Sequence, residues 1–184
     1  MTTAPRLEDD LDDVRAAPAS GGTVAMIVAR PGVDERAVVD VAELDVKHGL
    51  VGDNWLARGS SSTADGLADP DAQLTLMGAR AVALVAGDPS RWPLAGDQLY
   101  VDLDLSEDNL PVGTRLALGT AVVEVTAKPH TGCAKFAQRF GLDALRLVNS
   151  IEGKRLRLRG MYVRVITAGE VRVGDRVAKL DIPG

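Results

Sequence analysis

Short apolar runs with a period of two dominate the chain from Thr23 onward. In YVDLDL, residues 100–105, valine and leucine alternate with aspartate, which is the pattern of a strand with one buried and one solvated face. Glycine, proline and aspartate separate these runs. Strands are predicted over 23–30, 37–44, 72–77, 97–105, 114–119, 121–127, 161–168 and 175–180. Eight short strands at this spacing predict a mainly β domain with short helices, closed into a barrel or a strongly coiled sheet.

Two segments follow a helical pattern instead. Residues 78–87 are rich in alanine and end at a glycine, and residues 135–149 place aromatic and aliphatic side chains at approximately helical spacing. Gly141 is expected to divide the second segment into two short helices. Residues 56–70 are rich in glycine, serine and aspartate, so a long irregular loop is predicted there.

The chain is divided into a tail and one domain. Residues 1–22 cluster acidic side chains and end in small, turn-forming residues, so we expect a flexible acidic tail. A short helix over 7–16 is the alternative for part of it. Residues 23–184 are predicted to form a single barrel-like domain, whose core valine, leucine and alanine must fill because aromatic residues make up only 3% of the chain.

Charge and cysteine content narrow the classes of function. A net charge of -5 argues against a nucleic-acid-binding surface, which requires a footprint of lysine and arginine. One cysteine cannot form an internal disulfide, and this favours a reducing cytoplasm. No apolar run approaches the roughly 20 residues needed to cross a bilayer, so no membrane partner is expected.

The stretch KPHTGCAKF, residues 128–136, holds the single cysteine of the chain, Cys133. A predicted strand ends before it and a predicted helix begins after it. Unpaired N–H groups at a helix N-terminus stabilise a thiolate, and Lys128, His130 and Lys135 can add positive charge. Cys133 is therefore a candidate nucleophile, with His130 as a candidate catalytic partner. The alternative is an inert thiol that fills a gap in the core.

A second histidine lies in a similar turn, KHGLVGD, residues 47–53. His48 and Asp53 are therefore candidates to line the same pocket as His130 and Cys133. Two exposed loop histidines are the alternative. These four side chains can also be considered as a zinc site, but their spacing does not demand one.

A basic stretch, GKRLRLRGMYVR, residues 153–164, contrasts with the acidic chain. Arg155, Arg157 and Arg159 alternate with leucines, so in a strand their guanidinium groups would share one face and could bind phosphate bidentately. The alternative is a solvated strand edge protected by charge.

Taken in order, several motifs resemble the MOSC domain, named for the C-terminal domain of molybdenum cofactor sulfurases, and especially its stand-alone bacterial members. The resemblance runs through KHGLVGDNW, QLTLM, DLDLSEDNLPVGTRLALG, VVEVTAKPHTGCAKFAQRFG, VNSIEGKRLRLRGMYVRV and GEVRVGDRV. It covers nearly everything between residues 23 and 180. The ordered series is far more specific than any single motif.

This resemblance implies a barrel-like fold that binds the molybdenum cofactor, a pterin that carries phosphate. It makes Cys133 the candidate persulfide carrier or metal ligand. The residues then considered for cofactor binding are His48, Asp53, Asn109, Lys135, Arg157 and Arg159, with the two arginines as phosphate partners and Asn109 orienting polar groups at its turn. The activity implied is sulfur transfer or molybdenum-dependent reduction of N-hydroxylated compounds.

The sequence also departs from larger relatives. It has no room for a pyridoxal-phosphate desulfurase domain, so no pyridoxal phosphate is expected, and it shows no flavin or iron–sulfur fingerprint. A separate sulfur donor or electron-transfer protein is therefore expected, and a homodimer is possible. Two alternatives are a non-catalytic carrier of the cofactor and a thiol-dependent hydrolase or peroxidase with His130 as base.

Overall fold

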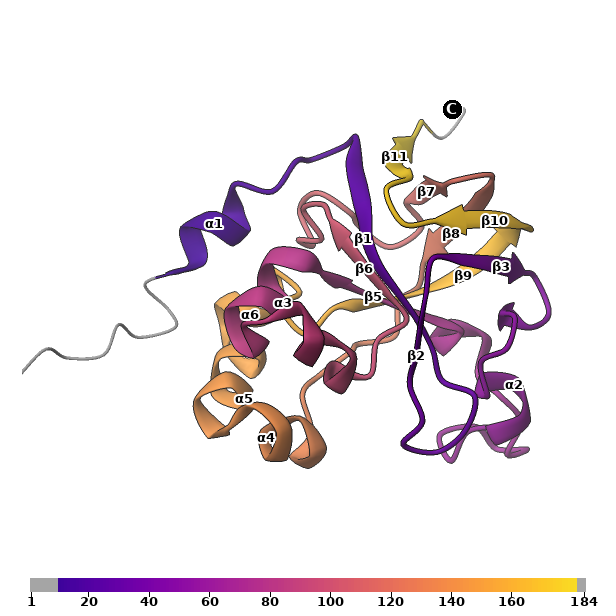
Figure 1. Cartoon of the computed structure of the whole chain (residues 1–184), viewed down its shortest axis with the longest axis horizontal. Coiled ribbons are helices and arrows are strands. Elements are labelled where there is room, and N and C mark those ends of the chain that lie inside the picture. The colour runs from indigo at the N-terminus through magenta and orange to yellow at the C-terminus, as the bar shows by residue number, and fades with distance from the viewer. Residues whose placement is uncertain (1–9, 182–184) are drawn as a thin grey trace, which may run out of the picture.

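Seven strands close into a barrel in the computed structural model, which describes residues 10–181. The order around the barrel is β1 (Gly22–Ala29), β6 (Leu99–Asp102), β5 (Leu74–Gly78), β9 (Met161–Thr167), β8 (Ala121–Val125), β7 (Arg115–Leu118) and β11 (Arg176–Leu180). Strand β11 pairs again with β1, which closes the ring (Figure 1). All neighbours are antiparallel except β5 and β6. The predicted mainly β, barrel-like fold is confirmed.

Three further strands flank this ring. Strand β2 (Ala37–Val39) extends the sheet beyond β1, and β3 (Val41–Asp45), β4 (Gly49–Leu50) and β10 (Gly169–Arg172) form a small second sheet. The predicted strand over 37–44 is thus divided between two sheets, with the break at Asp40. Strands β4 and β10 were not predicted, because two- to four-residue strands leave no periodic signal.

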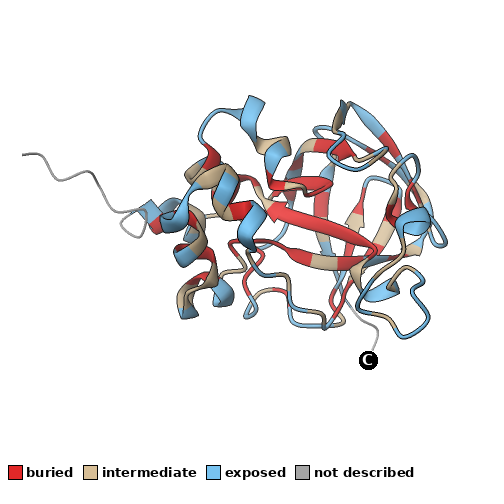
Figure 2. Cartoon of the chain, turned by 90° about the horizontal axis from the view of Figure 1, so that it is seen from below, coloured by how far each residue is buried: buried red, intermediate tan, exposed pale blue. Residues whose placement is uncertain are grey.

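The barrel interior is filled by aliphatic side chains that point inward from alternate positions. Leu76, Leu99 and Val163 are completely buried, and Figure 2 shows buried residues along the barrel strands. Each fully buried leucine or valine contributes roughly 1.5–3 kcal/mol relative to an exposed one. The interior therefore explains why the barrel is stable, and it leaves no space there for a ligand site.

Helices gather on one side of the barrel (Figure 1). They are α3 (Ala79–Ala86), α4 (Ala134–Phe140), α5 (Leu142–Asn149) and α6 (Ile151–Arg155). Phe136, Leu147 and Leu158 are among the residues of the hydrophobic cluster that packs α4 and α5 against α3. The predicted division at Gly141 is confirmed: its φ of 93° suits glycine and ends α4.

The predicted tail differs from the structure where the structure describes it. Residues 11–15 form helix α1 (Leu11–Arg15), whose Leu11 is buried in the helical cluster, and the Asp13 carbonyl accepts a hydrogen bond from Arg80. Leu11, with Val14 beside it on the same cluster and the Arg80 contact, anchors this acidic segment, which composition alone does not reveal. Residues 1–9, including the start of the alternative helix over 7–16, lie outside the described residues.

The prediction that Arg155, Arg157 and Arg159 share one face of a strand is wrong. Ser150 caps α6 by accepting a hydrogen bond from the Gly153 N–H, and the chain then turns before β9 begins. Arg157 adopts a left-handed conformation with a φ of 49°, so the alternation is broken at the middle arginine. A helix cap upstream has overridden the period-two pattern.

Three short helical elements, α2, η2 and η3, complete the description of the fold. Helix α2 (Trp55–Arg58) replaces the first part of the predicted loop, and residues 59–69 are irregular as expected. The 3₁₀ helices η2 (Pro70–Ala72) and η3 (Pro89–Ala95) precede β5 and β6. Over residues 10–181, no helix has the length and apolar character that a bilayer crossing requires.

Candidate functional site

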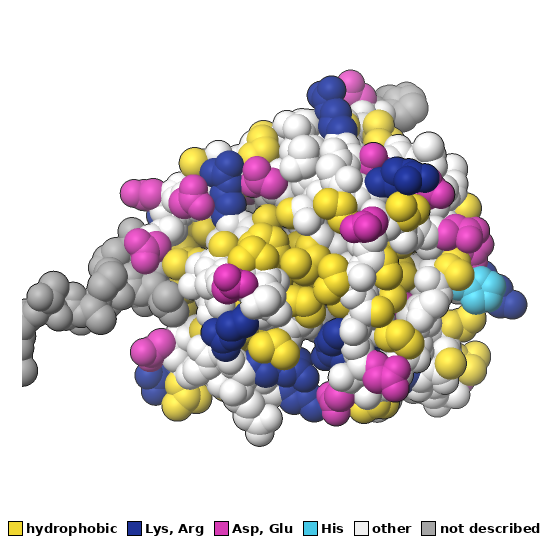
Figure 3. Space-filling model, in the orientation of Figure 1, with side chains coloured by type: hydrophobic (Ala, Val, Ile, Leu, Met, Phe, Trp, Pro, Cys, Tyr) yellow, Lys and Arg dark blue, Asp and Glu magenta, His cyan; other side chains and the backbone are white. Residues whose placement is uncertain are grey.

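A cleft of about 620 Å³ opens at one end of the barrel, between α4 on one side and α2 with the residues around position 34 on the other. We call it the basic cleft. Its basic residues are Arg30, Arg36, Arg58, Lys128, Lys135, Arg139 and Arg159, and the acidic residues that line it within 10–181 are Asp34 and Asp69. Figure 3 shows basic side chains gathered along a hollow at the lower edge of the molecule. A protein of net negative charge thus concentrates positive charge at one concave site, which favours an anionic ligand.

Cys133 lines the basic cleft, and it is exposed. It is the N-cap residue of α4, in an extended conformation. The pKa of the thiol is lowered, chiefly by the nearby Phe136 N–H at the start of α4, although burial opposes this effect. The Lys135 N–H and the charges of Arg159 and Arg139 also lower it. The reading of Cys133 as a buried gap-filler is therefore wrong, and the thiolate predicted at a helix N-terminus is supported.

The turn that carries Cys133 is fixed by α5. Asn149 accepts a hydrogen bond from the Gly132 N–H at 2.9 Å and donates one to the Gly132 carbonyl at 3.1 Å. A Cβ atom at Gly132 would lie 2.8 Å from Leu145 and 2.9 Å from Val148, closer than real Cβ contacts. Glycine at this position lets the turn pack against α5 and directs the following thiol into the cleft.

Four arginines of the cleft are held by one short backbone segment, residues 93–96. The pairs are Pro93 O with Arg36 Nε at 3.1 Å, Leu94 O with Arg139 Nη1 at 2.8 Å, Ala95 O with Arg159 Nη2 at 2.9 Å, and Gly96 O with Arg30 Nη1 at 3.2 Å. Because each carbonyl presents the negative end of a dipole, this segment offsets the repulsion among the four guanidinium groups. Burial, followed by Arg139 and Arg30, lowers the pKa of Arg36, which reflects how closely the cations are gathered.

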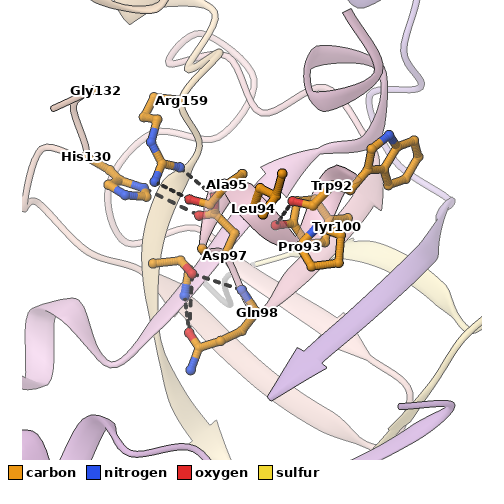
Figure 4. A network of polar contacts seen from close by, with 12 residues as sticks. Trp92, Pro93, Leu94, Ala95, Asp97, Gln98, Tyr100, His130, Gly132 and Arg159 are labelled. Carbon is orange, nitrogen blue, oxygen red and sulfur yellow. Dashed lines mark hydrogen bonds and ion pairs between the residues drawn. The ribbon is translucent and has the colours of Figure 1, made fainter. Parts of the chain in front are cut away.

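A buried carboxylate orients the deepest of these arginines. Asp97 Oδ2 accepts a hydrogen bond from Arg159 Nη1 at 2.5 Å, and the Asp97 side chain is inaccessible to solvent. Its other oxygen lies 3.8 Å from His130 Nδ1, and neither of these two atoms has a hydrogen-bond partner in the described chain. Figure 4 shows Arg159 and His130 both directed at Asp97. The His130 ring also stacks on Tyr162, with centroids 4.5 Å apart.

His130 is a neutral imidazole in this setting. Burial lowers its pKa to about 4, and the neighbouring Arg159 adds to that effect more strongly than Asp97 opposes it. At physiological pH the ring can therefore accept a hydrogen bond or a proton through an unprotonated nitrogen, whereas it does not add positive charge as the sequence suggested.

Asp53 affects the basic cleft indirectly, by holding Arg30 in place. Its carboxylate accepts two side-chain hydrogen bonds from Arg30, through Nε and Nη2, each at 2.9 Å, and a third from the Arg30 backbone N–H. Asp53 is fully buried and does not line the cleft, but it fixes an arginine that does. Its predicted place near the site is thus approximately right, with a role in positioning Arg30.

Lys128 joins the irregular loop to the cleft. Its amine lies 2.6 Å from Asp69 Oδ2 and 2.9 Å from Ser62 Oγ. The Lys128 amine is therefore already paired, and it holds residues 59–69 against the mouth of the cleft. An anionic ligand that reached Lys128 would compete with Asp69 for it.

Three of the predicted residues lie elsewhere. His48 is exposed and paired with Asp45 at 2.7 Å, so the two histidines do not share a pocket. Asn109 bridges the Ala19 and Asp104 carbonyls, away from the cleft. Arg157 does not line the basic cleft, and its Nη1 atom donates hydrogen bonds to the Leu105 and Leu110 carbonyls. Among residues 10–181, no three histidine, cysteine or acidic side chains are grouped to hold a metal ion, so the zinc reading finds no support.

Sequence reasoning missed several residues that shape the cleft. Arg30, Arg36, Arg139 and Asp97 stand singly in different parts of the chain, and no motif connects them. Trp92 packs near Tyr100, and the residues that follow it hold the arginines. The available signal for these residues was Asp97, a single aspartate between the turn residue Gly96 and a strand. Such a residue indicates a functional site only weakly.

The chain was compared with known families and structures. A model of the MOSC domain matches residues 68–178, which is more than half of the chain. No curated protein sequence matches it significantly.

Several solved structures share its fold. YuaD from Bacillus subtilis has a TM-score of 0.64 at 15% identity, over 85% of this chain and 93% of that one. YiiM from Escherichia coli has a TM-score of 0.56 at 20% identity, over 88% of this chain and 71% of that one. A crystal structure titled as a hypothetical protein has a TM-score of 0.59 at 22% identity, over 94% and 72%.

Proposed function

The chain belongs to the MOSC domain family, which is associated with binding of the molybdenum cofactor, and we propose that its basic cleft holds this cofactor with Cys133 as the sulfur ligand of the metal. The observation that carries the proposal is the convergence of an exposed thiol of lowered pKa and seven basic side chains on one cleft. A molybdenum centre is matched by a soft thiolate, and a phosphate by arginines.

The residues of the cleft fit such a group. Arg36 and Arg139 each use part of the guanidinium to bind a backbone carbonyl, so that their remaining N–H groups are available to a phosphate. Arg30 is already engaged by Asp53 and the Gly96 carbonyl, and contributes less to such binding. The Nε atom of Arg159 is buried without a partner in the described chain, which is the kind of donor that a ligand satisfies. Lys135, at the start of α4, lies beside Cys133 in the same lining.

We assign the activity to reduction of small N-hydroxylated compounds. When bound, the cofactor supplies a metal that can exchange two electrons. In that reaction the N–O bond breaks, two protons and two electrons are taken up, and water leaves. The two protons come from solvent. His130, neutral and buried at the cleft, can accept a hydrogen bond from the N–OH group of the substrate, and Asp97 Oδ1 lies 3.8 Å from its ring. The electrons must come from a separate protein, and the reduced thiol implies a cytoplasmic location.

The test is the molybdenum and pterin content of protein purified anaerobically from cells that make the cofactor. Wild type is expected to hold both in near-stoichiometric amounts. Cys133→Ala should lose molybdenum, because its only sulfur ligand from the described chain is removed. Arg58→Ala combined with Arg139→Ala should lose pterin as well, by about tenfold or more, because two charge-assisted contacts are absent.

The matched control is Arg164→Ala. Arg164 is an exposed arginine of β9 that pairs with Glu124, and it does not line the basic cleft. This variant should keep the wild-type content. If it loses pterin to the same extent as the cleft variant, or if wild type purifies without pterin, the proposal fails.

Sulfur transfer is the second candidate, and the exposure of Cys133 favours it. A thiolate that reaches solvent can accept sulfur from a protein donor and carry it as a persulfide. Mass spectrometry after incubation with a cysteine desulfurase and cysteine tests this function. An added sulfur atom on wild type, absent from Cys133→Ala, together with no reductase activity, would favour sulfur transfer over reduction.

A further inference from the structure

A second cavity, of about 560 Å³, lies beside the basic cleft. Lys128, His130 and Arg159 line both spaces, so the two adjoin. Arg157, which the sequence had suggested for cofactor binding, lines this second cavity and not the basic cleft. The remaining walls come from the turn before β7, residues 126–131, helix α6 and the turn before β9. A space of this size suits a small organic molecule.

One side of the second cavity is apolar. Its apolar residues include Pro111, Val112, Pro129, Val148 and Met161. Val112 is 58% exposed, whereas Val148 and Met161 are buried, so the apolar surface runs from the rim to the interior. An apolar body of a ligand would remove Val112 from water, and this favours occupation of the cavity by something other than solvent.

Basic side chains line the same cavity, and one of them, Arg157, lies 3.7 Å from Met161 through its Nη1 atom. Lys154 lies on α6, and its amine forms no ion pair with any of residues 10–181. Arg157 lines the same wall, and Glu107 is the acidic residue of the described lining. The two shared cations are paired with Asp69 and Asp97, so the small excess of positive charge in the cavity comes from Lys154 and Arg157 against Glu107. A ligand with one anionic group is therefore favoured over a neutral or cationic one.

The guanidinium group of Arg157 is held in a fixed position by the protein, with one edge left to bind an anionic group. Its Nη1 atom donates to the Leu105 and Leu110 carbonyls, at 3.1 and 2.6 Å, which fixes the guanidinium plane. Its Nε and Nη2 atoms have no hydrogen-bond partner within the described chain, and this pair forms the edge that binds a carboxylate bidentately. The residue also holds a left-handed φ of 49° just after a helix, where glycine is usual.

We propose that the second cavity binds a small organic carboxylate, with its charge on Arg157 and Lys154 and a planar apolar body against Val112, Pro129 and Met161. The site is distinct from the basic cleft, and its existence does not depend on cofactor binding. Since the segment 126–131 forms its wall and leads directly to Cys133, a bound carboxylate adjoins the backbone that positions the thiol.

The test compares two probes with the same apolar body, 2-naphthoate and 2-naphthamide, by isothermal titration calorimetry on the full chain. Wild type should bind the carboxylate about tenfold more tightly than the amide, because a bidentate charge-assisted pair is made only with the former. Arg157→Gly suits the left-handed backbone and should abolish this preference. Lys154→Ala, at an exposed position, should reduce it by about threefold.

Controls separate this proposal from the proposed function. Lys47→Ala removes an exposed lysine elsewhere and should leave the preference unchanged. Arg139→Ala, in the basic cleft, should also leave it unchanged, and Lys154→Ala should keep wild-type cofactor content. Equal affinity for both probes, absence of binding, or a preference that is lost in Arg139→Ala and kept in Arg157→Gly and Lys154→Ala would overturn the proposal, whatever the cofactor content proves to be.

Discussion

Two turns of the chain look alike in sequence and differ in structure. KHGLVGD, residues 47–53, and KPHTGC, residues 128–133, each combine a lysine, a histidine and a glycine. In the first, His48 is 54% exposed and pairs with Asp45, three residues away. In the second, the His130 side chain is only 10% exposed and faces Asp97, from a different part of the chain. The local pattern therefore does not decide which histidine belongs to a site.

The difference arises from what packs over each turn. The first turn connects β3 to β4 at the barrel surface, and its histidine has a partner within its own turn. The second lies between the barrel end and α5, where Tyr162, Arg159 and the 93–97 segment enclose the ring. A polar group that is enclosed must find its partners in the protein, so substitutions at the second turn should cost more.

The largest expected effect comes from removing the carboxylate that faces each histidine. Asp97→Asn leaves Arg159 buried and unpaired, and should lower the free energy of unfolding by about 3–5 kcal/mol. Asp45→Asn is the matched change at the first turn, and should alter stability little because that pair is screened by solvent. Urea unfolding of both variants measures the contrast. Similar losses in the two variants would remove the distinction between the turns.

The second-largest expected effect is on how the free energy of unfolding depends on pH. His130 has a pKa of about 4 when folded and 6.5 when unfolded, so the unfolded chain binds its proton first as the pH falls. The stability that this group contributes is complete above pH 6.5 and is lost as the pH falls toward 4, by about 3 kcal/mol. His130→Gln should therefore show a shallower fall of unfolding free energy between pH 6.5 and 4.

The control for that measurement is His48→Gln, which removes an imidazole but keeps His130. Its unfolding free energy should fall with pH as steeply as that of wild type over the same interval, because the buried ring is intact. If the unfolding free energy of His130→Gln fell with pH as steeply as that of wild type, the His130 ring of the wild-type protein would have to be solvated. That result would contradict its enclosure between Tyr162 and Arg159.

Much of the fold could be predicted from the sequence because strands carry a local signal. Alternation in residues 115–118 and 121–125 reflects one more buried and one less buried face, and both strands are present. The strand at 99–102 is also present, but its first three residues are all buried. The pattern failed at residues 155–159, where leucine alternates with arginine for a different reason: α6 and its following turn bury the leucines. Periodicity cannot distinguish these cases without knowledge of the preceding cap.

The site was only partly predictable. Cys133 and His130 lie at a strand-to-helix junction, and such a junction is visible in the sequence. The cleft around them depends on four arginines that meet at residues 93–96, and each contributes through a contact between distant parts of the chain. No spacing rule connects residues so far apart, so their convergence required the structure.

A smaller effect is expected in the chemistry of the thiol. Because the N–H groups of Phe136 and Lys135 lower the pKa of Cys133, its alkylation by iodoacetamide should reach half its maximal rate at a lower pH than an ordinary cysteine. The matched control is Thr131→Cys with Cys133→Ser, which places a thiol in an exposed position of the same turn. Its midpoint should lie higher. The reverse order would mean that the helix N-terminus does not stabilise the thiolate.

The smallest effect is expected at the first turn itself. His48→Gln should leave the molybdenum and pterin content of the protein unchanged, because His48 points to Asp45 and does not line the basic cleft. His130→Gln should lower that content, because the side chain lines the cleft and packs beside Arg159. Anaerobic purification of both variants with metal analysis compares them directly. If His48→Gln lost cofactor as His130→Gln does, the first turn would have to close over the ligand, and the two similar sequences would serve one site after all.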